Sequence, residues 1–220
     1  MYPPEPWHLR GQMYLSVFLI PRRNMPALPP ALDAAVRPVT VGGRVAVGAA
    51  WVSYEPGGVL HYRELLSAVL VHERGRPRVS ITDIWVDSVA SREGGRRLWG
   101  IPKELADFTL DAETEPLVDA TVTAPGGPPI GSALVRLKRR LPGRYPLGFT
   151  VAQQLGEQVR RTPVRGRAGL RTAAAAWRPE PDGPLAYLAG RRPVLSLAVT
   201  DFWLTFGRSA EDRAKSRSAG

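Results

Sequence analysis

Hydrophobic and polar residues alternate along much of the chain in short runs that are typical of β-strands. Residues 78–86, RVSITDIWV, are the clearest case, because β-branched and aromatic residues alternate there with polar ones. Residues 11–20, GQMYLSVFLI, alternate in part, and residues 44–55 have a similar pattern. Residues 62–73, YRELLSAVLVHE, fit either a helix or a strand. The strands predicted around them, and the RGRP turn that follows, favour a strand.

The second half of the chain has the same organisation. Turns rich in glycine and proline are predicted at APGGPP, LPGR and EPDGP. The further strands predicted between and around these turns are residues 106–113, 116–124, 132–140, 145–154, 170–179 and 194–206. About ten short strands and few helices predict a mainly β fold, in which an antiparallel sheet closes into a barrel or folds into a sandwich.

Two short helical segments are expected. PPALDAAV, residues 29–36, has prolines where a helix begins and predicts one helical turn. Asp87 or Ser88 can cap a second short helix, with residues 91–93 in its body. The glycine pair at residues 94–95 is expected to end that helix or to start a tight loop.

The size and composition of the chain predict one globular domain. The chain has 220 residues, of which 44% are hydrophobic and 23% charged, so it can bury a substantial core. We assign residues 1–207 to that domain and predict a disordered polar tail over residues 208–220.

Cellular location is inferred from features that the sequence lacks. Cysteine is absent, which excludes disulfides and thiolate metal sites. The opening MYPPEPWHLR does not have the basic region and apolar run of a signal peptide. Apolar stretches such as LLSAVLV, residues 65–71, are too short to span a bilayer. We therefore expect a soluble, cytoplasmic protein with no membrane partner.

The strong positive charge leaves nucleic acid open as a partner. The formal net charge is +10 and the pI is about 10.7. The arginines are scattered, however, and the densest cluster, RLKRR at residues 136–140, ends a predicted strand. We expect a solvated basic surface and no nucleic-acid site. Strong, salt-dependent binding to arbitrary DNA would favour the alternative.

Lysine is rare in this chain and therefore informative. Of the 30 lysines and arginines, only Lys103, Lys138 and Lys215 are lysines. Arginine carries charge equally well, but it cannot act as an amine nucleophile because its guanidinium stays protonated. Lys215 lies in the predicted tail. Lys103 follows the stiff GIP approach among large apolar residues, so it is either the candidate nucleophile or a surface lysine that caps a loop.

The segment around Lys103 resembles a known active site. GRRLWGIPKELADF, residues 95–108, is similar to the segment of the acetoacetate decarboxylase-like superfamily in which a glycine–arginine pair precedes a Pro-Lys sequence. WHLRGQMYLSV, residues 7–17, resembles the N-terminal strand of that family, and YRE, residues 62–64, resembles its acidic catalytic segment. The three segments follow the family order over roughly residues 5–205.

The resemblance implies a cone-like β-barrel with peripheral helices, a buried pocket and often an oligomer. It also implies that Lys103 forms a Schiff base with a keto acid and that no cofactor is needed. Glu64 would then be a catalytic group that moves protons, and Arg10 would bind the substrate carboxylate, helped by Trp99 and Tyr62 as substrate-binding residues. Without the resemblance, Arg10 fits a surface ion pair with Glu5, and Glu64 fits a solvent-facing strand residue.

One departure from true acetoacetate decarboxylase affects the reaction expected. There the reactive lysine is followed by a second lysine, whereas here Glu104 follows, and a nearby anion favours the protonated amine. Burial lowers a lysine pKa, so Lys103 can still react if its pocket is apolar and Glu104 points away. We expect a decarboxylase, with an aldolase, dehydratase or cyclase using the same imine, or a non-catalytic binding member, as alternatives.

Other chemistries find little support. His8, His61 and His72 are too few and too scattered to predict a metal site. The glycine-rich turns do not match a phosphate-binding loop, and no serine hydrolase motif occurs. We therefore expect no metal and no cofactor, a small keto acid as the partner, and assembly into a homo-oligomer.

Overall fold

A mainly β fold is present in the computed structural model, which describes residues 1–112 and 116–208. Lys215, and the predicted tail except for Arg208, lie outside the described residues. The helices are α1 (Pro30–Ala35) and α2 (Val89–Trp99), with short 3-10 helices η1 (Arg22–Asn24) and η2 (Ala186–Leu188). The strands are β1 (Trp7–Pro21), β2 (Arg37–Pro38), β3 (Thr40–Val41), β4 (Arg44–Tyr54), β5 (Tyr62–Glu73), β6 (Arg76–Val86), β7 (Lys103–Leu105), β8 (Asp107–Asp111), β9 (Leu117–Thr123), β10 (Pro129–Leu155), β11 (Gln158–Pro179) and β12 (Leu195–Phe206). No helix in this part of the chain is long and apolar enough to cross a membrane.

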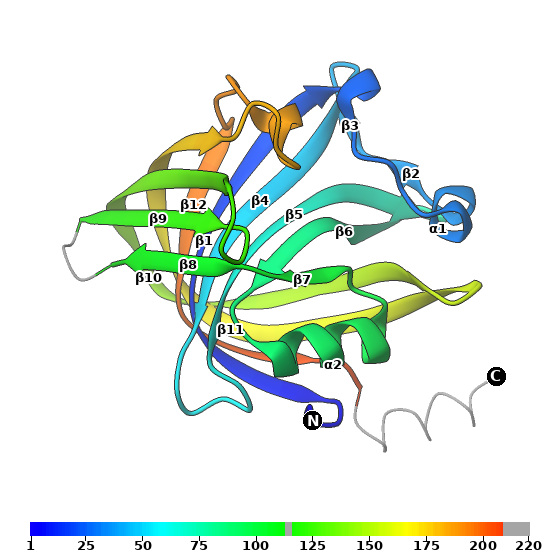
Figure 1. Ribbon diagram of the computed structural model, residues 1–220, viewed down its shortest axis with the longest axis horizontal. Coiled ribbons are helices and arrows are strands. Elements are labelled where there is room, and N and C mark those ends of the chain that lie inside the picture. The colour runs from blue at the N-terminus through cyan, green and yellow to red at the C-terminus, as the bar shows by residue number, and fades with distance from the viewer. Residues whose placement is uncertain (113–115, 209–220) are drawn as a thin grey trace.

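The described strands form one large, curled sheet. Its order is β7-β6-β5-β4-β1-β12-β11-β10-β9-β8, with β2 on β5 and β3 on β4. Figure 1 shows the strands curving round to give a cone-like shape, with α2 beside β7 and β11. The prediction of a mainly β, cone-like fold is confirmed. The sheet is mixed and not purely antiparallel, because α2 returns the chain to β6 as a parallel neighbour, β7.

The sheet closes where β6 meets β10. The two strands share one parallel backbone pair, Val79 with Val151. Beyond that pair, the buried amide of Gln153 replaces a backbone peptide. Its nitrogen donates to the Ile81 carbonyl at 2.9 Å, and its oxygen accepts from the Ile81 N–H at 3.0 Å and from the Ser80 hydroxyl at 3.3 Å. One side chain therefore continues the hydrogen bonding across the seam.

The central strand β5 is buried on both faces, which explains why its sequence was ambiguous. Glu64 and Ala68 face the interior of the cone, whereas Leu65 and Val69 belong to hydrophobic clusters on the opposite face. A strand covered on both faces has no polar side to alternate with its apolar side. The preference for a strand over residues 62–73 is confirmed, with the same bounds as β5.

The predicted turn at LPGR is wrong. β10 runs through these residues without reversing, and its register with β11 shifts between Leu137 and Arg140 and again between Leu141 and Tyr145. Gly143 adopts a φ of 86°, which only glycine takes easily, so the Pro-Gly sequence makes an irregularity within a strand. The two expected strands at residues 132–140 and 145–154 are parts of one.

Candidate active site

Lys103 is positioned by α2 and the short connection after it. Of the two caps predicted for α2, Asp87 and Ser88, the Ser88 side chain is the one that caps it, by accepting from the Ser91 N–H at 3.2 Å. The helix ends at Gly100, whose φ of 69° turns the chain and whose N–H donates to the Arg96 carbonyl. Three residues after Gly100, Lys103 pairs with Ile84 at the start of β7.

The glycine pair does not end α2, as expected from sequence, but lies in its middle. A Cβ on Gly95 would lie 2.7 Å from Cδ of Lys103, and one on Gly94 would lie 2.4 Å from the ring of Trp7. Any larger residue would collide with these side chains. The helix accepts two weak helix formers because they allow it to pack directly on the lysine and on Trp7.

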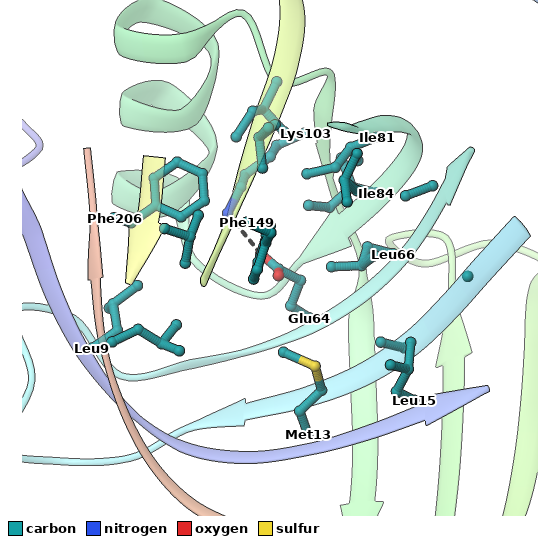
Figure 2. Close-up of a pocket in the computed structure, with 18 of the residues that line it drawn as sticks. Leu9, Met13, Leu15, Glu64, Leu66, Ile81, Ile84, Lys103, Phe149 and Phe206 are labelled. Carbon is teal, nitrogen blue, oxygen red and sulfur yellow. Dashed lines mark hydrogen bonds and ion pairs between the residues drawn. The ribbon is translucent and has the colours of Figure 1, made fainter. Parts of the chain in front are cut away.

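The Lys103 amine is buried and fully hydrogen-bonded. Its side chain is only 5% exposed, and Nζ donates to Oε2 of Glu64 at 2.7 Å, to Oγ of Ser91 at 2.9 Å and to the Tyr62 hydroxyl at 3.3 Å. Figure 2 shows the lysine pointing at Glu64, joined to it by a dashed line. An ammonium group has three N–H bonds, so each has an acceptor.

Glu64 connects the lysine to a second tyrosine. Its other oxygen, Oε1, accepts from the Tyr54 hydroxyl at 3.1 Å. The rings of Tyr54 and Tyr62 pack with their centroids 4.4 Å apart, and the Lys103 nitrogen lies 5.0 Å from the centre of the Tyr62 ring. The carboxylate is 3% exposed, so its charge is compensated by these contacts and not by water.

These contacts decide the protonation states of Lys103 and of the two tyrosines. Burial by itself lowers the pKa of Lys103, but Glu64 and Tyr62 outweigh it, so the pKa lies above its ordinary value of 10.5. Burial and the Glu64 charge raise the pKa of Tyr62 to about 12 and that of Tyr54 well above its ordinary value. Near neutral pH, the lysine is an ammonium that donates to Glu64, and both tyrosines are neutral phenols.

Glu104 does not take part in this group. It follows Lys103 on a strand, so its side chain points to the opposite face, where it is 60% exposed and pairs with Arg96. Arg96 also donates through Nε to the Lys103 carbonyl at 2.6 Å. The anion that acts on the amine is therefore Glu64, and the residue that departs from the pattern of true acetoacetate decarboxylase faces solvent.

Lys103 and Glu64 open onto an apolar cavity of about 360 Å³ inside the cone. Among the described residues that line it, the polar side chains are Lys103, Glu64, Tyr54 and Tyr62. Figure 2 shows Leu66 and Leu15 on one side of the pair and Leu9 and Phe206 on the other. Phe149 lines the cavity and is 41% exposed, so it lies where the cavity meets solvent.

The structure brings together three of the five predicted site residues. Lys103, Glu64 and Tyr62 come from β7 and β5 and meet at one end of the cavity. Arg10 and Trp99 are not among the residues that line it.

Arg10 and Trp99 face other surroundings. Arg10 alternates on β1 with Leu9, which lines the cavity, so the arginine faces outward, 46% exposed and 3.9 Å from Glu55. Trp99 packs edge-on against Trp7, with ring centroids 4.7 Å apart, and donates to Glu5 at 2.9 Å. Trp99 therefore packs behind Trp7, which lines the cavity, and does not line the cavity itself.

Sequence reasoning missed Ser91 and Tyr54 at the site. Ser91 is four residues before Gly95, so it lies on the same face of α2, and this spacing could have identified it once Lys103 was chosen. Tyr54 pairs with Tyr62 across β4 and β5. That pairing follows from the strand register, which the sequence does not define.

The arrangement provides a nucleophile and a proton acceptor in contact. Transfer of one proton from Nζ to Glu64 leaves a neutral amine and a neutral acid, with no net charge moved into the cavity. A neutral amine attacks carbonyl carbon, and the acid can then protonate the oxygen that leaves. The apolar wall excludes water from such an intermediate.

Solved structures with this fold include known enzymes. The acetoacetate decarboxylase of Legionella pneumophila is 18% identical, with a TM-score of 0.68 over 94% of this chain and 86% of that one. The enduracididine biosynthesis enzyme MppR, complexed with pyruvate, is 19% identical, with a TM-score of 0.66 over 97% and 93%. An acetoacetate decarboxylase-like enzyme from Sphingomonas wittichii is 14% identical, with a TM-score of 0.55 over 93% and 92%. At these identities, the similarity shows the fold alone.

Family membership comes from the sequence comparison. None of the curated proteins matches the chain. The family model described as acetoacetate decarboxylase matches residues 26–180, which is more than half of the chain and includes Glu64 and Lys103. The chain belongs to the acetoacetate decarboxylase family.

Proposed function

We propose that the protein is a cofactor-independent carbon–carbon lyase that binds a keto acid as a Schiff base on Lys103, with decarboxylation as its reaction. The observation that carries the proposal is the contact of 2.7 Å between the buried Lys103 nitrogen and Glu64, at one end of an apolar cavity. The family and its fold support a lyase of this type.

The reaction begins with proton transfer from Lys103 to Glu64. The neutral amine adds to the ketone carbon, and Glu64 transfers two protons in turn from the nitrogen to the oxygen, which leaves as water. The product is a protonated imine, which draws electrons. The bond to the carboxylate carbon then breaks, carbon dioxide leaves, and the electron pair enters an enamine. Protonation of the enamine carbon and addition of water release a ketone and restore the lysine.

The neighbouring residues have supporting roles in this proposal. Tyr54 holds Glu64 in place through its hydroxyl, while Ser91 and Tyr62 orient the amine. Tyr62 also lines the space where the substrate would bind. The outward position of Arg10 gives it no part, so the protonated imine is the cation that faces the substrate carboxylate.

An aldol-type reaction is the second candidate. The same fold occurs in MppR complexed with the condensation product of pyruvate and imidazole 4-carboxaldehyde, at 19% identity and a TM-score of 0.63. The enamine formed on a lysine can attack an aldehyde instead of taking a proton. A non-catalytic binding role is the third, and the raised pKa of Lys103 is the observation that favours it.

Borohydride trapping tests the proposal. The protein is incubated with a panel of 2-keto and 3-keto acids, reduced, and mapped by mass spectrometry. We expect one adduct, on Lys103, which is lost in Lys103→Arg and kept in the matched control Lys138→Arg, because Lys138 is exposed on β10. Release of carbon dioxide identifies decarboxylation. If no acid modifies Lys103, the Schiff-base function is wrong.

Three further expectations belong to the same proposal. We propose that residues 1–207 act as one catalytic domain, that the enzyme is a homo-oligomer and that it works in the cytoplasm. The family resemblance suggests the oligomer, and light scattering of the purified full chain tests it. A mass equal to one chain would contradict it.

A further inference from the structure

The cavity is larger than a short keto acid requires. A water molecule occupies about 30 Å³ in the liquid, so about 360 Å³ has room for about a dozen groups of that size. Pyruvate or acetoacetate would leave much of this space empty. An apolar cavity of this kind favours an apolar ligand that fills it.

The apolar part of the cavity extends along β5. Glu64, Leu66 and Ala68 all face into it, and Glu64 and Ala68 are four residues apart. At a rise of about 3.3 Å per residue, the part of the wall between Glu64 and Ala68 is about 13 Å long. An extended chain advances about 1.2 Å per bond, as the protein backbone does, so about ten carbons span this distance.

The charges decide how a keto acid can lie in the cavity. Among the described residues that line it, Lys103 is the only cation, and Arg10 lies outside. A carboxylate placed along the wall at Leu66 or Ala68 would be buried without a partner, which is strongly unfavourable. The carboxylate must therefore stay beside the lysine nitrogen, and the other side of the ketone must carry the apolar group.

We propose that the substrate is a 3-oxo acid whose ketone carries an apolar chain of up to about ten carbons. This inference rests on the proposed Schiff-base function and specifies its substrate. The bond between the second carbon and the carboxylate breaks, and one proton replaces the carboxylate. A 3-oxo acid anion and a proton thus give a methyl ketone and carbon dioxide. A class of reaction that makes 3-oxo acids by joining acyl units must supply the substrate.

Methyl ketones provide a stable test because they are the products of this chemistry and can form the imine in reverse. A series from acetone to 2-pentadecanone, whose chain has thirteen carbons, is incubated with the protein at one concentration and reduced with borohydride, and the Lys103 adduct is quantified. We expect the initial yield to rise by about fourfold per methylene group, until the cavity is full at about ten carbons. Equal yields along the series, or the highest yield with acetone, would overturn the inference.

Melting temperatures of the unreduced samples separate the two proposals. Stabilisation that grows with chain length, without any adduct, overturns the Schiff-base function and supports an apolar ligand. Adducts that do not depend on chain length overturn the apolar substrate and support the Schiff base. If neither an adduct nor stabilisation is observed, both proposals are wrong.

Two cavity variants test where the chain lies. Ala68→Leu fills part of the cavity beyond Leu66, so we expect the best ketone to become shorter by two or three carbons. Leu66→Ala shortens a side chain of the wall and so enlarges the cavity, which should make the best ketone longer. Ala174→Leu makes the same change as Ala68→Leu at an exposed position of β11 and should leave the optimum unchanged. If both cavity variants keep the wild-type optimum, the chain does not follow β5.

Discussion

At the scale of single residues, one contact has to satisfy two opposite requirements. Lys103 must lose a proton to become a nucleophile, yet Glu64 stabilises the protonated form and holds the pKa of the amine above its ordinary value. The same carboxylate is also the nearest group able to take that proton. We infer that a carbonyl in the cavity draws the proton across, because its addition to the neutral amine removes that amine from the proton-transfer equilibrium.

The first prediction concerns Glu64→Gln. The anion that raises the pKa of Lys103 is then removed, and burial, which lowers the pKa, remains. We expect the amine to be neutral at a lower pH than in the wild type, and to react with acetic anhydride at pH 8 roughly tenfold faster or more. Turnover should fall by about 100-fold or more, because the proton acceptor is lost.

Peptide mapping after brief acetylation over a range of pH measures this reactivity. The exposed Lys138 is an internal reference in every sample and should react equally in both proteins. An unchanged or slower reaction at Lys103 in the variant would contradict the role given to Glu64.

A site residue can be predicted from sequence where its rarity or the motif around it identifies it. The scarcity of lysine and the resemblance around residues 95–108 identified Lys103, and the YRE segment identified Tyr62 and Glu64. Arg10 is suggested only by the resemblance of residues 7–17, and one step of strand alternation places it on the outer surface. The same alternation turns Glu104 away from the Lys103 amine. The expectation that Glu104 keeps that amine protonated therefore depended on the direction of its side chain, which composition does not show.

At the scale of elements, α2 shows how packing overrides local preference. Two adjacent glycines usually end a helix, and the sequence prediction followed that rule. Here the helix continues because Ser88 caps it, Gly100 ends it, and the glycines allow it to lie on Lys103 and Trp7. The close contact appears only when β7 lies beside the helix, so no local pattern could have predicted it.

The second prediction concerns Gly95→Ala. In an exposed helix this change adds about 1 kcal/mol of stability. In α2 the new methyl group would lie 2.7 Å from Cδ of Lys103, so the lysine or the helix must move. We expect turnover to fall roughly 10- to 100-fold, because the amine is displaced from Glu64, with no gain in melting temperature.

Steady-state kinetics and thermal melting of the same preparation measure both effects. Gly148→Ala is the matched control, since a Cβ at that exposed position meets nothing within 4 Å. A more stable Gly95→Ala protein with full turnover would show that the glycine does not position the lysine.

At the scale of the whole molecule, the cavity exists because the sheet closes on itself. Strand content was predictable from alternation and most turns from glycine and proline, and family resemblance added the cone-like shape. The closing seam was not predictable, because it joins β6 to β10 through a single backbone pair and the Gln153 side chain. A buried glutamine in YPLGFTVAQQ cannot be distinguished by pattern from the half-buried Gln154 that follows it.

The third prediction is that Gln153→Ala destabilises the whole fold. It leaves the N–H and carbonyl of Ile81 without their partner in a buried seam, which costs about 2–4 kcal/mol. For a chain of this length, the melting temperature should fall by about 6–12 °C.

Gln153→Glu keeps the shape of the side chain but cannot donate to the Ile81 carbonyl when ionised, so this variant should lose stability without creating a cavity. Circular dichroism melts compare both variants with Gln158→Ala, an exposed change that should lower melting by about 1 °C or less. If Gln153→Ala has the same melting temperature as Gln158→Ala, closure of the sheet does not depend on the Gln153 amide. The backbone pair between Val79 and Val151, with the side chains around it, must then hold the seam.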